Sequence, residues 1–387
     1  MVNNLGSRRQ LLMFLAAASF SSFSAMSIAR DIADVTFTPQ STVGDVLDEP
    51  LFEPFACYLL PLETVSRYRD LSEADRKMPL FRLSRLLPYH TYVDVSQACG
   101  ILNRLKARAK LGDRIWIPLS HKDAGLFFFP GPKGAPFVLI CAGGGFVYVG
   151  SIHEGFPYAE AMNRNGLNAF VLQYRVSGGG RTAMTDMAEG LHYIITHAKE
   201  LGVSETKYAL MGSSAGARMA AVMGDVGLEA YGFSDKSKTS AVLMAYTGYS
   251  DVSYNDPPTF MVQGTNDFIA PVRVVDWRMR AMKELGIEVE YMRVEGMPHG
   301  FGLGTKTAAE GWVDRAAAFF KRLLERSSGK GRDFQGIGFR TDDINRRPAS
   351  TRLTGPGFAQ QKDLMLILPT GYCFLFPSLA FLPTRPG

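Results

Sequence analysis

Cysteine is scarce in this chain, and the spacings that would hold a metal ion are absent. The 387 residues include only four cysteines. They are scattered along the sequence, with no CxxC pair among them, at Cys57, Cys99, Cys141 and Cys373. Neither a disulfide framework nor a metal site is therefore expected. Cys141 lies in an apolar run, where a free thiol behaves as a small hydrophobe.

The chain also lacks a strong excess of charge of one sign. Its 42 Lys and Arg residues nearly balance 37 Asp and Glu residues, giving a net charge of +5. The densest basic stretch, residues 104–114, alternates with apolar residues and indicates the solvated face of a helix. Because no basic cluster is interleaved with stacking aromatic residues, no nucleic-acid partner is expected.

Long apolar stretches occur only towards the two ends. Residues 11–29 are uncharged, follow Arg8 and Arg9, and end in small residues, which predicts a signal peptide over 1–29 and a periplasmic or secreted protein. The paired arginines resemble a twin-arginine signal, with a general secretory signal or an uncleaved anchor as alternatives. Residues 364–383 are interrupted by prolines, so no stable membrane span is expected there.

The mature sequence divides into sections that differ in composition and in the pattern of apolar and polar residues. Residues 30–114 predict a small helical appendage or lid, with Asp94 capping a helix over 95–111 and Gly112 ending it. Residues 115–327 predict the main domain. Residues 328–387 are rich in Gly, Pro and charge, and they predict a disordered or loosely docked tail.

Short apolar runs alternate with amphipathic stretches in the main domain. Because the apolar runs do not alternate with polar residues, they predict strands covered on both faces, in an α/β fold with a mostly parallel, doubly wound sheet and helices on both faces. The turn at 131–134 suggests an antiparallel hairpin at its start. The expected strands are 115–119, 126–129, 137–142, 169–174, 208–211, 241–245, 259–263 and 288–294. The expected helices are 154–165, 182–201, 215–224, 272–285 and 308–326.

The strongest chemical signal is the pentapeptide at 212–216, Gly-Ser-Ser-Ala-Gly. It follows a predicted strand and precedes a predicted helix, which is the context of a nucleophile elbow. Such a turn is so tight that only small residues fit around the serine. Ser214 is therefore the candidate nucleophile, and a mere helix cap is the alternative.

A serine hydroxyl needs a base and an orienting acid. His299 follows the last predicted strand, where the base of such a fold lies. Asp267 follows the strand at 259–263, so the chain order is Ser, Asp, His. Asp251 and Asp256 are rival acids, since they follow the preceding strand. The histidines at 192 and 197 fall within a predicted helix, and His121 precedes the sheet.

The developing oxyanion needs backbone donors. Three glycines, Gly143, Gly144 and Gly145, follow the strand at 137–142. Freed of Cβ atoms, they can turn their N–H groups towards an anion, which makes Gly144 and Gly145, together with Ala215 after the nucleophile, the expected oxyanion hole. A phosphate loop is the competing interpretation, but neither G-x-G-x-x-G nor GK[ST] occurs here.

These segments together resemble the acetyl-esterase and feruloyl-esterase-like (BD-FAE-like) group of α/β-hydrolases, related to hormone-sensitive-lipase-like esterases. The resemblance spans about residues 137–320 and implies hydrolysis of carboxylic esters, such as acetyl or feruloyl groups on carbohydrate. Such enzymes usually carry a histidine where this chain has Ala142, which puts the rigidity of the oxyanion loop in doubt. His153 is a possible substitute, with an ordinary loop histidine as the alternative.

The prediction is therefore an exported serine hydrolase that acts on carboxylic esters through an acyl-enzyme, without metal or organic cofactor. Phe146, Tyr148 and Tyr174 are expected to contact the substrate. A peptidase of the prolyl-oligopeptidase type and a non-catalytic binding protein on a hydrolase fold are the alternatives. A homodimer is left open.

Overall fold

The computed structural model describes residues 36–64 and 71–327. The predicted signal peptide and the predicted tail at 328–387 lie outside these ranges. The described residues from Phe37 onward belong to one compact unit.

An eight-stranded sheet forms the centre of this unit, in the order β1-β2-β4-β3-β5-β6-β7-β8. Only the pairings of β2 with β1 and with β4 are antiparallel. This is the mostly parallel α/β-hydrolase sheet that the sequence predicted, with strand ends within two residues of those expected. The strands are β1 (Trp116–Pro118), β2 (Gly125–Phe129), β3 (Phe137–Cys141), β4 (Asn168–Gln173), β5 (Tyr208–Ser213), β6 (Ala241–Ala245), β7 (Thr259–Gly264) and β8 (Val289–Val294).

The expected hairpin through 131–134 is wrong. The antiparallel hairpin at the start of the sheet is formed by β1 and β2, with Trp116 opposite Phe127. The turn at 131–134 instead leads from β2 to β3, and β4 lies between these two strands. Its glycine and proline signalled a change of direction. They did not reveal that a later strand would insert, because pairing depends on distant residues.

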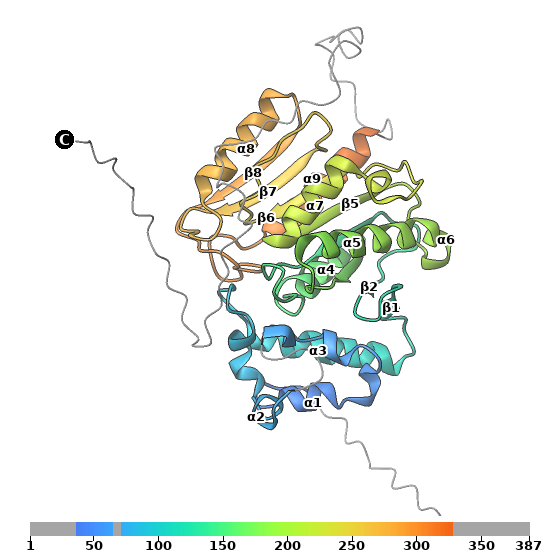
Figure 1. Ribbon diagram of the computed structural model, residues 1–387, viewed down its shortest axis with the longest axis vertical. Helices are drawn as coiled ribbons and strands as arrows, with labels where there is room; N and C mark the ends of the chain where they lie inside the picture. Colours follow the sequence, from blue (N-terminus) through green and yellow to red (C-terminus); the bar gives the residue numbers. More distant parts are fainter. Residues whose placement is uncertain (1–35, 65–70, 328–387) are drawn as a thin grey trace, which may run out of the picture. The chain divides into compact units, whose positions relative to one another are not determined.

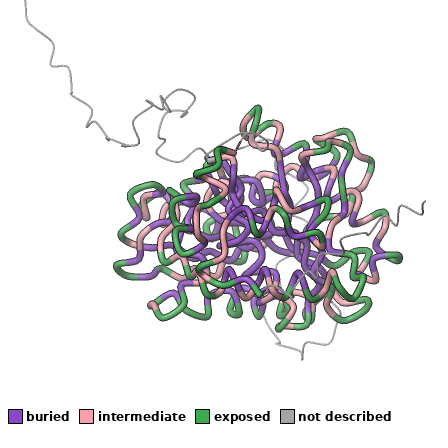
Figure 2. The backbone as a smooth tube through the Cα atoms, turned by 90° about the horizontal axis from the view of Figure 1, so that it is seen from below, coloured by how far each residue is buried: buried purple, intermediate pink, exposed green. Residues whose placement is uncertain are grey.

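Helices cover both faces of the sheet (Figure 1). Side chains of α4 and α9 belong to the apolar cluster on one face, and side chains of α5, α7 and α8 belong to the cluster on the other. Figure 2 shows the buried residues gathered in the interior and the exposed ones on the outer loops. The helices are α4 (Gly155–Arg164), α5 (Gly179–Thr196), α6 (Ala198–Leu201), α7 (Ala215–Val226), η5 (Leu228–Tyr231), α8 (Val272–Glu284) and α9 (Trp312–Ser327).

Two helix predictions needed correction. The single helix expected over 182–201 is interrupted at His197, whose ring stacks on Tyr193 at 4.0 Å between centroids. The last helix begins at Trp312 rather than at residue 308, because the preceding residues form turns that include Gly311 at φ +81°. No described helix is long and apolar enough to cross a bilayer.

The residues ahead of the sheet form short helices that pack on the α4 side. Asp94 caps α3, accepting a hydrogen bond from the N–H of Gln97 at 3.0 Å. Phe55 meets Phe127 of β2 edge to face. One expectation fails: Lys106, in the basic stretch, is buried in an ion pair with Glu49 at 2.7 Å. The elements are α1 (Val43–Leu47), η1 (Pro50–Phe52), η2 (Ala56–Tyr58), η3 (Leu62–Thr64), α2 (Glu73–Arg76), η4 (Leu80–Leu86) and α3 (Val95–Lys110).

Candidate active site

Ser214 occupies the sharp turn between β5 and α7. Its backbone has φ 50° and ψ −116°, a strained conformation for a residue with a side chain. The glycines around it are obligatory. A Cβ on Gly216 would lie 1.9 Å from the carbonyl oxygen of Cys141, and one on Gly212 would lie 2.3 Å from the backbone of Gly216. The local sequence therefore permits the elbow geometry that holds the serine at the sheet edge.

Three side chains separated by long stretches of sequence meet at this turn. The Oγ of Ser214 lies 2.9 Å from Nε2 of His299, and Nδ1 of His299 lies 2.7 Å from Oδ2 of Asp267. Since an ionised carboxylate only accepts hydrogen bonds, Nδ1 carries a proton. Nε2 is then free to accept the serine proton.

The Asp267 carboxylate is itself held in place. Its Oδ1 accepts hydrogen bonds from the N–H groups of Ile269 and Ala270, at 2.9 and 2.7 Å. The side-chain amide of Gln263 donates to Oδ2 at 3.0 Å. These donors orient the carboxylate towards the imidazole.

The rival acids and histidines have other partners. The carboxylate of Asp256 pairs with the buried Arg278 at 2.8 Å. Asp251 contributes only its backbone carbonyl to the same arginine. His192 pairs with Asp235 and stacks on Phe233. None of these contacts brings another acid or base to the serine.

The oxyanion loop, residues 143–146, turns through left-handed conformations. Gly144 and Gly145 have φ values of 133° and 64°, and Phe146 has φ 59°. The N–H of Gly143 donates a hydrogen bond to the carboxylate of Glu154 and is therefore not free to bind an oxyanion. The expected oxyanion donors Gly144 and Gly145 follow this anchored residue and Ala215 follows the nucleophile, and the role of all three stays a prediction.

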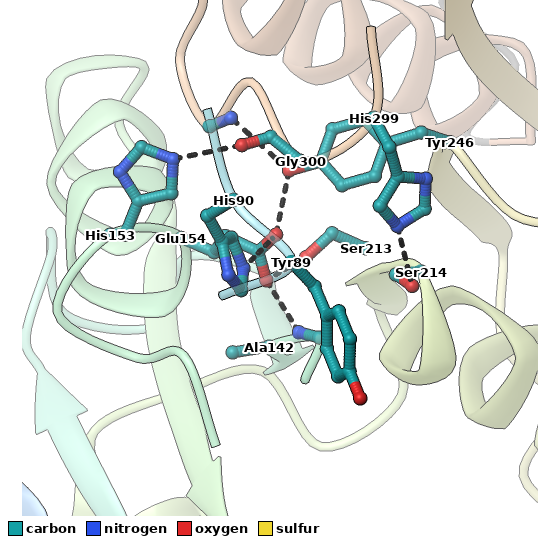
Figure 3. A network of polar contacts seen from close by, with 12 residues as sticks. Tyr89, His90, Ala142, His153, Glu154, Ser213, Ser214, Tyr246, His299 and Gly300 are labelled. Carbon is teal, nitrogen blue, oxygen red and sulfur yellow. Dashed lines mark hydrogen bonds and ion pairs between the residues drawn. The ribbon is translucent and has the colours of Figure 1, made fainter. Parts of the chain in front are cut away.

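Glu154 organises the interior behind the serine, a role that the sequence did not predict. Its fully buried carboxylate accepts hydrogen bonds from Gly143 N–H, from the Ser213 hydroxyl and from the Tyr246 hydroxyl. His90 Nε2 lies 2.9 Å from its Oε1 (Figure 3). Burial alone would raise the pKa of Glu154, but the attraction of His90 and the hydrogen bonds from His90 and Ser213 outweigh it and hold the pKa at about 2.

His90 was also missed, although it comes from the appendage. It belongs to a short strap, residues 89–91, that runs between the oxyanion loop and the His299 loop. The N–H and hydroxyl of Thr91 donate to the carbonyls of Gly300 and His299, at 2.9 and 2.8 Å. In the sequence, this segment shows only a histidine after Pro88, and no motif indicates its role.

Two of the expected substrate contacts are corrected. Tyr148 and Tyr174 are fully buried, so they present no surface to a substrate. The hydroxyl of Tyr174 donates to the carbonyl of Ala142 at 2.8 Å, and that of Tyr148 meets His90 Nδ1 at 2.9 Å. Both tyrosines support the oxyanion loop from behind. Phe146 is half-buried and stays a prediction.

His153 is neither an ordinary exposed histidine nor a support of the glycine run. It is buried, and its Nε2 lies 3.1 Å from the carbonyl of Gly300, beside the catalytic-histidine loop. Burial, together with repulsion from His90, lowers the pKa of His153 to about 4. The ring therefore stays neutral at neutral pH.

A hollow of about 190 Å³ opens beside His299. Phe268 and Ile269, which help to line it, are 80% and 59% exposed. Large apolar side chains with such exposure beside the candidate catalytic histidine offer a surface for an apolar or ring-shaped group. Its lining residues are Pro88, Tyr89, His90, Thr91, Asn266, Phe268, Ile269, Pro298 and His299.

The fold and the site define a class. An α/β-hydrolase sheet that presents a serine on a nucleophile elbow, within hydrogen-bond distance of a histidine, is the arrangement of serine hydrolases. Among the residues that the structure describes, no group of three or more His, Cys, Asp or Glu side chains could hold a metal ion.

Comparison with known proteins agrees with this class. Residues 130–244 match the BD-FAE family model. An acetylxylan esterase of Xylanibacter ruminicola is 24% identical over 210 residues, which cover 45% of this chain and 42% of that protein. The chain thus spans less than half the length of this curated relative.

Solved structures of esterases are also similar. Propionate-bound Est2 of Thermogutta terrifontis has 21% identity and a TM-score of 0.48, over 53% of this chain and 92% of its own. An acetyl ester-xyloside bifunctional hydrolase of Caldicellulosiruptor lactoaceticus has 20% identity and a TM-score of 0.47, over 52% and 88%. The chain is similar to BD-FAE-like α/β-hydrolase esterases, and the expected resemblance to a serine carboxylic ester hydrolase is confirmed.

Proposed function

We propose that the protein hydrolyses carboxylic esters through an acyl-enzyme formed on Ser214. The observation that carries this proposal is the continuous relay from Ser214 through His299 to Asp267. His299 takes the hydroxyl proton as Ser214 attacks the ester carbonyl, and it returns that proton to the departing alcohol. Asp267 stabilises the imidazolium that forms between these steps. Water, activated by the same imidazole, then releases the acid.

The oxyanion of each tetrahedral intermediate would be held by backbone N–H groups of Gly144, Gly145 and Ala215. The N–H of Ala215 begins α7, so the helix dipole adds to its effect. Donors fixed before the reaction stabilise the charge without reorganising. Their rigidity depends on the anchoring of Gly143 and Tyr148 described above.

The substrate class that we propose is a short acyl ester of a carbohydrate, in particular an acetyl ester. The acetylxylan esterase similarity supports this choice, as does the exposed Phe268 at the rim of the hollow, since an aromatic face suits a sugar ring. Feruloyl esters are the second candidate. Profiling the protein on acetylated xylan, feruloylated sugar and short p-nitrophenyl esters distinguishes these substrates.

The decisive test compares wild type with Ser214→Ala on p-nitrophenyl acetate. The exposed Ser234→Ala serves as the matched control. We expect only Ser214→Ala to lose activity, by at least about 10⁴-fold. A binding protein would show no difference between the variants, and a peptidase of the prolyl-oligopeptidase type would prefer amide substrates.

We further propose that the protein is exported to the periplasm or beyond, on the strength of the sequence at 1–29. Fractionation of cells that express the full chain, with N-terminal sequencing of the mature protein, tests this location. A cytoplasmic protein that retains Met1 would refute it. The homodimer stays a prediction, to be measured by light scattering of the purified protein.

A further inference from the structure

We propose that His90 is a positioning residue for ester hydrolysis: its side chain holds the start of the oxyanion loop through Glu154 and the residues just after that loop through Tyr148, while its strap contacts the catalytic-histidine loop. This inference rests on the function proposed above. It means that the segment ahead of the sheet supports the site from behind and does not act as a lid over it.

His90 first supports the oxyanion loop through the carboxylate of Glu154. This carboxylate has about four lone-pair positions, and four donors fill them. Ser213 and Gly143 meet one oxygen, while Tyr246 and His90 meet the other. One of these donors begins the oxyanion loop and another directly precedes the nucleophile. His90 thus completes the set that fixes Gly143 relative to Ser214.

His90 also supports the oxyanion loop through Tyr148, which lies two residues after it. Nδ1 of His90 lies 2.9 Å from the Tyr148 hydroxyl, which also accepts a hydrogen bond from the N–H of Tyr89 at 3.1 Å. The N–H of Tyr148 donates to the carbonyl of Gly144. The two ring nitrogens of His90 therefore contact Glu154 on one side and the Tyr148 hydroxyl on the other.

The strap contacts the opposite loop just as closely. Thr91 donates to the carbonyls of both His299 and Gly300. A Cβ on Gly300 would lie 2.3 Å from the carbonyl oxygen of Tyr89, so backbone packs on backbone here. One three-residue segment therefore contacts both the support of the oxyanion loop and the loop of the base.

There is little room for another arrangement. The His90 side chain is 2% exposed, and a Cβ on Gly150 would lie 2.9 Å from its Cε1. Although His90 lines the hollow beside His299, its side chain is almost fully buried, so the ring offers little surface to a substrate. Its loss should leave ground-state binding intact and loosen only the geometry of the transition state, which lowers kcat rather than raising KM.

The test compares His90→Leu, which keeps the bulk but removes both ring nitrogens, with His90→Gln, which restores one donor towards Glu154. His121→Leu is the control, since this half-buried histidine contacts Asp123 within its own turn. Activity on p-nitrophenyl acetate and thermal unfolding are measured for each. We expect His90→Leu to lower kcat about 10–100-fold with KM within about threefold, His90→Gln to recover about tenfold, and His121→Leu to match wild type.

Other outcomes would overturn the inference. They are a folded His90→Leu protein with wild-type kcat, a rise in KM alone, or a His90→Gln protein no better than His90→Leu. Should His90→Leu not fold, Tyr148→Phe removes only the hydroxyl and should lower kcat severalfold at unchanged KM, and an unchanged kcat would then refute the proposal. An inactive wild type would overturn the proposed function itself, a result distinct from all of these.

Discussion

Glu154 is a buried charge whose ionised form is stabilised entirely by donors. Tyr158 extends the set, because its hydroxyl lies 2.7 Å from that of Tyr246, whose own proton is directed to Glu154. Removing a carboxylate from water costs several kcal/mol, and only a full set of hydrogen bonds offsets this cost. The buried donors in turn depend on the Glu154 carboxylate as their hydrogen-bond acceptor.

Replacing Glu154 by Gln should be strongly destabilising although the shape is unchanged. The amide brings a donor group to a place where every neighbour already donates, so at least one buried hydrogen bond is lost and N–H groups oppose one another. We expect Glu154→Gln to lower the free energy of unfolding by about 2–5 kcal/mol, measured by denaturant titration.

Glu160 offers the matched control on the same helix. It pairs with the half-exposed Arg104, and such pairs contribute about 0–1 kcal/mol. Glu160→Gln should therefore lie within about 1 kcal/mol of wild type. Equal effects of the two substitutions would contradict the role given to Glu154.

His153 should make stability depend on pH. Its pKa falls from 6.5 to about 4 on folding, so between these values the unfolded chain binds a proton that the folded chain does not. The contribution of His153 to the free energy of unfolding is therefore fully present above pH 6.5. It is lost as the pH falls towards 4, by on the order of 3 kcal/mol. His90 and Glu154 are the titratable groups facing the ring.

Denaturant titrations at pH 7.5 and 4.5 measure this loss in wild type, in His153→Gln and in the control His121→Gln. The difference between the two pH values should shrink only in His153→Gln. If it stays the same there, another group is responsible for the loss.

At this scale the sequence predicted Ser214, His299 and Asp267 because each follows a strand in a recognisable context. It could not predict the supporting roles of His90 and Glu154. His90 lies outside the alternating pattern, and Glu154 begins a helix like any acidic residue. Their importance comes from a contact across 64 positions of sequence, which only the packed fold creates.

Among the elements, the strand-to-helix turn between β5 and α7 is the most constrained. Gly216→Ala should be far more costly than the usual gain of alanine in a helix, because the added Cβ would lie 1.9 Å from a backbone oxygen of β3. We expect a loss of several kcal/mol in unfolding free energy, or no folded protein. Thermal unfolding and activity measure the effect.

Gly190 provides the comparison within α5. A Cβ there would meet only side chains, at 3.2 Å or more, and alanine gains about 1 kcal/mol of helix propensity over glycine. Gly190→Ala should therefore stay within about 1 kcal/mol of wild type. Similar losses at both positions would refute the backbone argument.

Element prediction succeeded where the signal is local. Apolar runs located all eight strands, and Asp94 marked the start of α3. It failed where partners are distant: the position of β4 between β2 and β3 follows from the register of Gly125 opposite Gln173 and Phe137 opposite Asn168. No turn residue near 131–134 encodes that insertion.

On the scale of the whole molecule, the appendage and the hydrolase sheet share one core. A single apolar cluster contains Phe37 and Leu102 of the appendage, Val138 of the sheet and Phe320 of the last helix. Together with the strap, this cluster ties the segment ahead of the sheet to the catalytic residues. The appendage is thus part of what makes the site rigid.

The shared core predicts a single cooperative unfolding transition for residues 37–327. Elements that bury their apolar surface against one another lose that burial together, so the appendage should not melt before the sheet. Scanning calorimetry should give one peak whose calorimetric and van't Hoff enthalpies agree, and activity should disappear over the same interval. An early peak that leaves esterase activity intact would show instead that the appendage is an independent domain, and it would separate the strap from catalysis.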